Sequence, residues 1–156
     1  LGALIALSAA RYIAASSRRL QHLFVSGRHW PGEQAEEKID SSHLSDDELL
    51  ELFTARYGTQ GAAMENPEVR EMVMPVLRAD FSLLISCPEM RAKPLPRPVT
   101  VFSGSDDPGT ADKDLSLWKT ETQADFSHHV IPGGHLFHME RSEKVLQHIR
   151  IHLEKT

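Results

Sequence analysis

Two short segments of this sequence carry side chains that can move protons. The first is Ser103-Gly104-Ser105-Asp106-Asp107-Pro108, and the second is Pro132-Gly133-Gly134-His135. An imidazole can act as a general base and then as a general acid, while a buried carboxylate fixes its tautomer and stabilises the imidazolium. Asp107 and His135 are therefore a candidate catalytic pair. The alternatives are a turn or helix-capping acid at 107 and a polar loop residue at 135.

Both segments directly follow predicted strands. The pattern of apolar residues predicts strands over 99–102 and 126–131, and helices over 111–122 and 142–153. Strands that alternate with helices indicate a parallel sheet covered by helices, the α/β class. In such sheets functional residues gather at the carboxyl ends of the strands, so we expect the two segments to meet there.

The earlier part of the chain predicts further elements of this sheet and an insertion. An Ala- and Leu-rich pattern over 2–19 indicates a helix, and residues 22–27 indicate a strand. Ser45 and Glu48 form a capping box for a helix that Gly58 ends. Asn66-Pro67 opens a second helix, in which we expect a kink at Pro75. We therefore divide the chain into a core segment, 1–43, a helical insertion, 44–87, and a second core segment, 88–156.

Composition excludes several kinds of partner. The formal net charge is −5 and the basic residues are scattered, which argues against nucleic acid. The apolar stretch 1–15 is too short for a membrane span, and its arginines do not precede it as in a signal peptide. Neither a membrane nor secretion is predicted, and the location we expect is the cytoplasm.

Nine histidines and one cysteine raise the question of a metal site or a thiol nucleophile. His128 and His129 are adjacent in a strand and point to opposite faces, while His148 and His152 suggest a solvated helix edge. Because no carboxylate or cysteine cluster accompanies them, we predict no metal. Cys87 precedes Pro88 without a basic neighbour, which favours a structural thiol.

A serine nucleophile on a G-x-S-x-G turn would complete the pair, and α/β-hydrolases place the acid and then the histidine after it. That motif is absent from the sequence, but Leu1-Gly2 before a helix matches its end. We therefore expect the serine directly before Leu1, with the early strands of the sheet also missing. The chain as given would then be inactive alone.

The sequence resembles the type II thioesterases of nonribosomal peptide and polyketide synthases, which are similar to the medium-chain thioesterase of animal fatty-acid synthesis. The resemblance covers nearly the whole chain. It rests on Leu1-Gly2-Ala3, Leu23 to Arg28, Leu44 to Leu49, Pro75 to Phe81, Gly104 to Pro108, Trp118 and Pro132 to His135. It implies an α/β-hydrolase fold with a helical lid at 44–87. Matching the motifs assigns the triad acid to Asp107 rather than Asp106, and the histidine to His135.

The resemblance also implies hydrolysis of acyl or aminoacyl thioesters on the phosphopantetheine arm of acyl or peptidyl carrier proteins, with no cofactor of its own. The backbone N–H of Leu1 would serve the oxyanion hole. Apolar residues of the lid would contact the acyl chain: Met72, Val76, Leu77, Phe81 and Leu84. The sequence departs from the usual family pattern at two places. The family usually has Thr-Pro after two glycines where this chain has Gly58-Thr59-Gln60-Gly61, and two aromatic residues where it has Leu136-Phe137. These differences concern the shape of the lid and the preference for particular acyl groups. Two alternatives stay open, namely an esterase of another class and a non-catalytic module that docks on carrier proteins.

Overall fold

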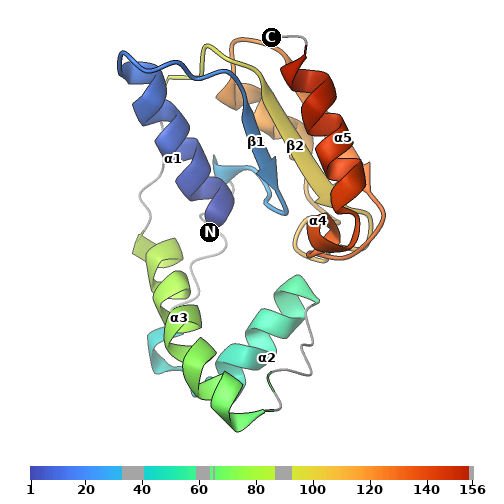
Figure 1. Cartoon of the computed structure of the whole chain (residues 1–156). Coiled ribbons are helices and arrows are strands. Elements are labelled where there is room, and N and C mark those ends of the chain that lie inside the picture. Colours follow the sequence, from blue (N-terminus) through green and yellow to red (C-terminus); the bar gives the residue numbers. More distant parts are fainter. Residues whose placement is uncertain (33–40, 59–63, 65, 87–92, 155–156) are drawn as a thin grey trace.

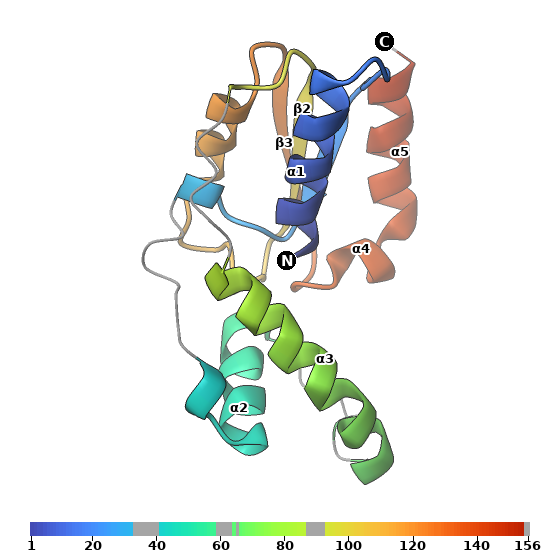
Figure 2. The same cartoon turned by 90° about the vertical axis from the view of Figure 1, so that its left-hand side faces the viewer.

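A parallel sheet between helices forms the centre of the molecule. The computed structural model describes residues 1–32, 41–58, 64, 66–86 and 93–154. The sheet has the order β1-β2-β3, with β1 at Leu23–Ser26, β2 at Val99–Gly104 and β3 at Phe126–Ile131. Helices α1 (Gly2–Ala15) and α5 (Ser142–Leu153) lie on opposite faces of the sheet (Figure 2). The predicted α/β class with a parallel sheet is therefore confirmed.

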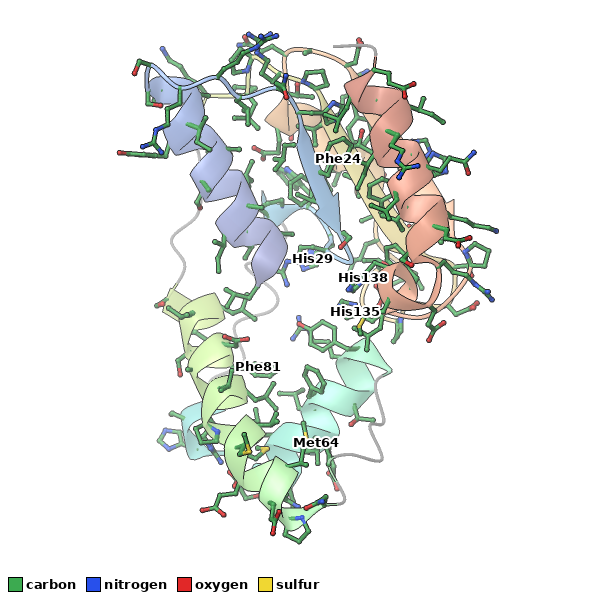
Figure 3. All side chains as sticks on the ribbon, viewed as in Figure 1. Phe24, His29, Met64, Phe81, His135 and His138 are labelled. Carbon is green, nitrogen blue, oxygen red and sulfur yellow. The ribbon has the colours of Figure 1, made fainter. Side chains whose placement is uncertain are left out.

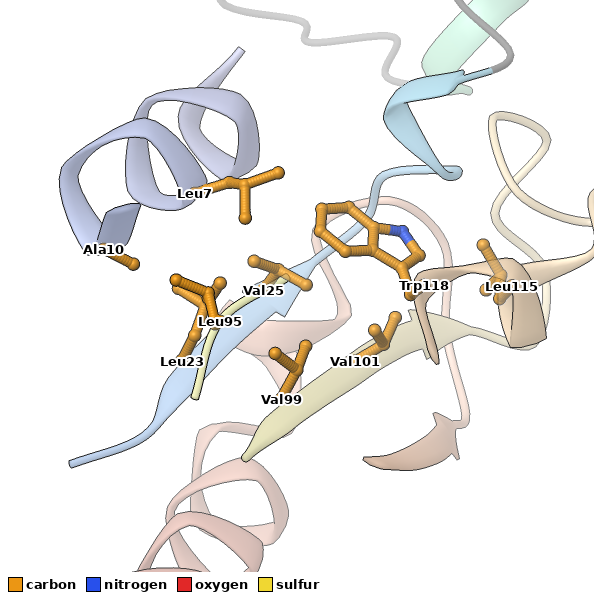
Figure 4. Packing of buried hydrophobic residues seen from close by; sticks show 9 residues of the cluster. All are labelled: Leu7, Ala10, Leu23, Val25, Leu95, Val99, Val101, Leu115 and Trp118. Carbon is orange, nitrogen blue, oxygen red and sulfur yellow. The ribbon is translucent and has the colours of Figure 1, made fainter. Parts of the chain in front are cut away.

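The larger core lies between the sheet and α1. Figure 4 shows aliphatic side chains of β1 and β2 packed under Leu7 and Ala10 of α1 and beside Trp118. Trp118 belongs to η4, a 3₁₀ helix over Leu115–Glu121, and is fully buried. Its indole Nε1 donates to the carbonyl oxygen of Arg28 at 3.0 Å. This contact fixes the loop that follows β1.

The other face of the sheet is covered by α5 and contains a group of aromatic rings. The rings of His129 and His148 have centroids 4.0 Å apart. His152 Nε2 lies 3.0 Å from the hydroxyl of Ser127, and its ring meets Phe24 edge to face. Our expectation of a solvated edge for the two helix histidines is wrong, because both are half-buried and face the sheet.

Helices α2 (Asp46–Tyr57) and α3 (Pro67–Ser86) form a pair beyond one end of the sheet (Figure 1). The predicted capping box is present, since Ser45 Oγ accepts from the Glu48 N–H and the Glu48 carboxylate accepts from the Ser45 N–H. Gly58 ends α2 at φ 64° as predicted. The pair is joined by its own cluster of buried residues, Leu49, Met74, Leu77 and Phe81.

Some elements differ from the prediction. The first helix ends at Ala15 rather than Arg19, because the Ser16 hydroxyl donates to the Ile13 carbonyl and accepts from the Arg18 N–H. The expected helix over 111–122 is only the 3₁₀ helix η4, which starts where the Asp114 side chain accepts from the Ser116 N–H. Short α4 (Phe137–Glu140) was not predicted.

Several predictions fall partly or wholly outside the described residues. They concern the thiol of Cys87 and the departure from the family pattern at Thr59-Gln60. Within the described helices, none is long and apolar enough to cross a bilayer.

Candidate active site

Hydrogen bonds join the two loops that carry the acid and the histidine. The Ser105 N–H donates to the Ile131 carbonyl and the Asp106 N–H donates to the Gly133 carbonyl, each at 2.9 Å. Gly104 is required here, because a β-carbon on it would overlap the carbonyl oxygens of Gly133 and Gly134. The side-by-side pairing of β2 and β3 therefore continues past the ends of the strands.

Asp107 and His135 meet as the sequence predicts. His135 Nδ1 donates to Asp107 Oδ2 at 3.0 Å, and Asp107 Oδ1 accepts from the Gly109 N–H at 2.9 Å. The Asp107 side chain is completely buried, whereas that of His135 is 22% exposed. A carboxylate held in this way fixes the tautomer of the imidazole and leaves its Nε2 to exchange protons. Asp106, the weaker alternative, is exposed.

The imidazole of His135 is closely surrounded. A β-carbon on Gly27, which has φ 60°, would lie 2.9 Å from His135 Cε1. The ring of Tyr57, at the end of α2, has its centroid 4.6 Å from that of His135. The loop after β1 and the end of α2 therefore both contact the candidate catalytic ring.

A cavity of about 350 Å³ opens beside His135. Its walls come from the start of α1, including Leu1, from the end of β1 through Arg28, and from α2 and α3. Figure 3 shows Phe81 on α3 and His135 beyond β3 on two sides of this region. The cavity is thus shared by the helix pair and the end of the sheet.

The structure separates the five predicted acyl-contacting residues into two groups. Leu77, Phe81 and Leu84 line the cavity. Met72 and Val76 are absent from its walls, and they are 76% and 59% exposed. The reason is the helical period, which turns positions 72 and 76 away from the face that buries Met74, Leu77 and Phe81. The structure therefore places Met72 and Val76 outside the wall of this cavity.

The walls of the cavity also contain residues that were not predicted as part of the site, namely Phe53, Tyr57, Asp80, Arg28 and Gly27. Tyr57 stood out in the sequence only as the residue before a helix-ending glycine. Leu77 and Phe81 marked the face of α3 that lines the cavity, so Asp80 could have been found from its helical spacing to them. Nothing in the sequence pattern links α2 with His135.

Other histidines near the sheet have their own contacts. His128 Nε2 lies 2.9 Å from the Ser103 hydroxyl, His129 packs on His148, and His138 lines the cavity. Among the residues that the structure describes, no three His, Cys, Asp or Glu side chains gather as metal ligands would.

Comparison with known proteins places this geometry in a family. The family model described as "Thioesterase domain" matches residues 1–153. The gramicidin S biosynthesis protein GrsT of Aneurinibacillus migulanus is 33% identical over 148 residues, which are 94% of this chain and 57% of GrsT. The chain thus spans little more than half the length of this relative.

Solved structures give the same result. The RedJ thioesterase from the prodiginine pathway of Streptomyces coelicolor superposes with a TM-score of 0.80 at 28% identity, over 97% of this chain and 60% of RedJ. The type II thioesterase BorB from the borrelidin cluster superposes with a TM-score of 0.81 at 28% identity, over 97% of this chain and 61% of BorB. These neighbours are of the α/β-hydrolase type. The chain belongs to the thioesterase domain family, and its relatives include type II thioesterases of peptide and polyketide synthesis.

Proposed function

We propose that the full-length protein hydrolyses acyl or aminoacyl thioesters held on the phosphopantetheine arm of carrier proteins, and so removes wrongly loaded groups. The observation that carries the proposal is the Asp107–His135 hydrogen bond at the wall of a partly apolar cavity. Membership of the thioesterase family supports the reaction class. The acyl or peptidyl carrier proteins and the cytoplasmic location remain predictions.

The proposed nucleophile is a serine that directly precedes Leu1 in the full-length protein. Leu1 and His135 line the same cavity, so a residue joined to Leu1 would come close to the imidazole. His135 Nε2 takes the proton of the serine hydroxyl as the oxygen attacks the thioester carbonyl. The imidazolium then gives this proton to the sulfur as the C–S bond breaks, so the arm leaves as its thiol and the serine is acylated. Water, activated by the same nitrogen, then releases the acid and frees the serine.

The oxyanion of each tetrahedral intermediate needs hydrogen-bond donors. We assign one of them to the backbone N–H of Leu1, at the beginning of α1. The start of a 14-residue helix also carries partial positive charge, which favours an anion at this position.

Two substrates that differ only in the leaving group test the proposal. The full-length protein is incubated with an acyl carrier protein thioester and with the p-nitrophenyl ester of the same acid. Faster release from the carrier, abolished when the serine before Leu1 is changed to alanine, supports the proposal. Preference for the free ester supports an esterase of another class, and carrier binding without turnover supports a docking module.

A further inference from the structure

The end of helix α2 contacts the His135 ring and the loop that carries Asp107. Besides the ring contact between Tyr57 and His135, a β-carbon on Gly109 would stand 3.3 Å from the Arg56 carbonyl oxygen and 3.6 Å from Tyr57 Cδ1. A β-carbon on Gly58 would touch Pro108 at 3.4 Å. The last residues of α2 therefore contact both the loop of the acid and the ring of the histidine.

Tyr57 is itself fixed by the helix pair. Its ring packs on Phe53, one turn earlier, at 5.1 Å between centroids, and Phe53 packs against the buried cluster of α2 and α3 that contains Phe81. The Gly58 N–H donates to the Thr54 carbonyl at 2.8 Å, which closes the last turn of the helix. The ring of Tyr57 is thus connected through Phe53 to the buried cluster that contains Phe81.

We propose that Tyr57 is a positioning residue, which couples the α2–α3 pair to the catalytic histidine. Its ring restricts rotation of the His135 imidazole, so that Nδ1 stays on Asp107 while Nε2 faces the cavity. It also stabilises the imidazolium that forms when His135 takes a proton, because an aromatic ring within about 6 Å attracts a cation. This inference rests on the proposed function, since it concerns the same reaction.

Substitutions in the full-length protein can separate the contribution of the Tyr57 ring from that of its hydroxyl. Tyr57→Leu and Tyr57→Met remove the ring, with Met as the second variant should Leu impair folding, and Tyr57→Phe retains it. We expect the two aliphatic variants to lower kcat about tenfold, within the range of one cation–aromatic contact, with little change in KM. Tyr57→Phe should restore kcat. Tyr12→Leu is the matched control, because Tyr12 is 73% exposed on α1.

A second measurement does not depend on activity. The ¹H resonance of the proton on His135 Cε1 should shift in Tyr57→Leu and stay in place in Tyr12→Leu, because the Tyr57 ring current acts at short range. If the wild type hydrolyses no thioester, the proposed function fails while this resonance still reports the contact. An unchanged kcat in Tyr57→Leu, a loss confined to KM, or an equal loss in Tyr57→Phe would overturn the inference.

Discussion

Gly104 and Gly133 approach each other so closely that a side chain on Gly104 would overlap the carbonyl oxygen of Gly133. This approach brings the loops of Asp107 and His135 together. We therefore expect Gly104→Ala to separate the loops, to destabilise the fold by about 1–3 kcal/mol through overpacking, and to lower thioester hydrolysis. Urea unfolding and kcat of the full-length protein measure the two effects.

The control for this change is Gly134→Ala, assessed for stability alone. A β-carbon on Gly134 would meet no atom within 4 Å. The urea midpoint of Gly134→Ala should therefore stay close to that of the wild type. Equal stability of the two alanine variants would contradict the role that we give to the Gly104 approach.

Replacement of the buried acid should remove most of the activity. In Asp107→Asn the amide can present its NH₂ group to His135 Nδ1 and favour the wrong tautomer, which in a serine triad costs on the order of 10⁴-fold in kcat. The comparison is Asp106→Asn, because Asp106 is the adjacent carboxylate and is exposed. The measurement is kcat of the two full-length variants with a soluble acyl thioester. A comparable loss of kcat in Asp106→Asn would contradict the assignment of Asp107 as the acid that positions His135.

Phe81 should limit the length of the acyl chain. It is 5% exposed and lines the cavity, so Phe81→Ala enlarges the space beside His135 and should move the preference for acyl substrates toward longer chains. The same change should cost about 3 kcal/mol of stability, because it leaves a void in the cluster between α2 and α3.

Met72→Ala is the matched variant on the same helix. Met72 is 76% exposed and does not line the cavity. For Met72→Ala we expect the same relative kcat/KM values as for the wild type across thioesters of increasing acyl-chain length. If both variants shift the preference alike, the cavity is not the acyl site.

Local chemistry made much of this site predictable. The strands 99–102 and 126–131 and the glycine-rich ends after them placed Asp107 and His135 at one edge of a sheet, and the capping box at Ser45 located α2. Contacts that depend on how separate helices pack were not predictable in this way. Tyr57 on His135 and Trp118 on the Arg28 carbonyl depend on how α2 and η4 pack, and periodicity within an element carries no information on that packing.

The histidine residues under α5 should make stability depend on pH. Burial, and then the charge of His152, lower the pKa of His22 from 6.5 to about 4. Burial lowers the pKa of His129 as well, followed by the charges of His148, His152 and His128. In each case the folded state disfavours the protonated ring, so the unfolded chain binds more protons at mildly acidic pH.

The stabilisation from neutral His22 is therefore complete above about pH 6.5, the ordinary pKa, and is lost as the pH falls toward about 4. We expect the urea midpoint of the protein to fall between pH 7 and pH 5. His22→Asn and His129→Asn remove one titrating ring each, so the fall should be smaller in both variants even where their stability at pH 7 is reduced. An identical fall in the wild type and both variants would show that other groups, such as carboxylates, cause the acid sensitivity.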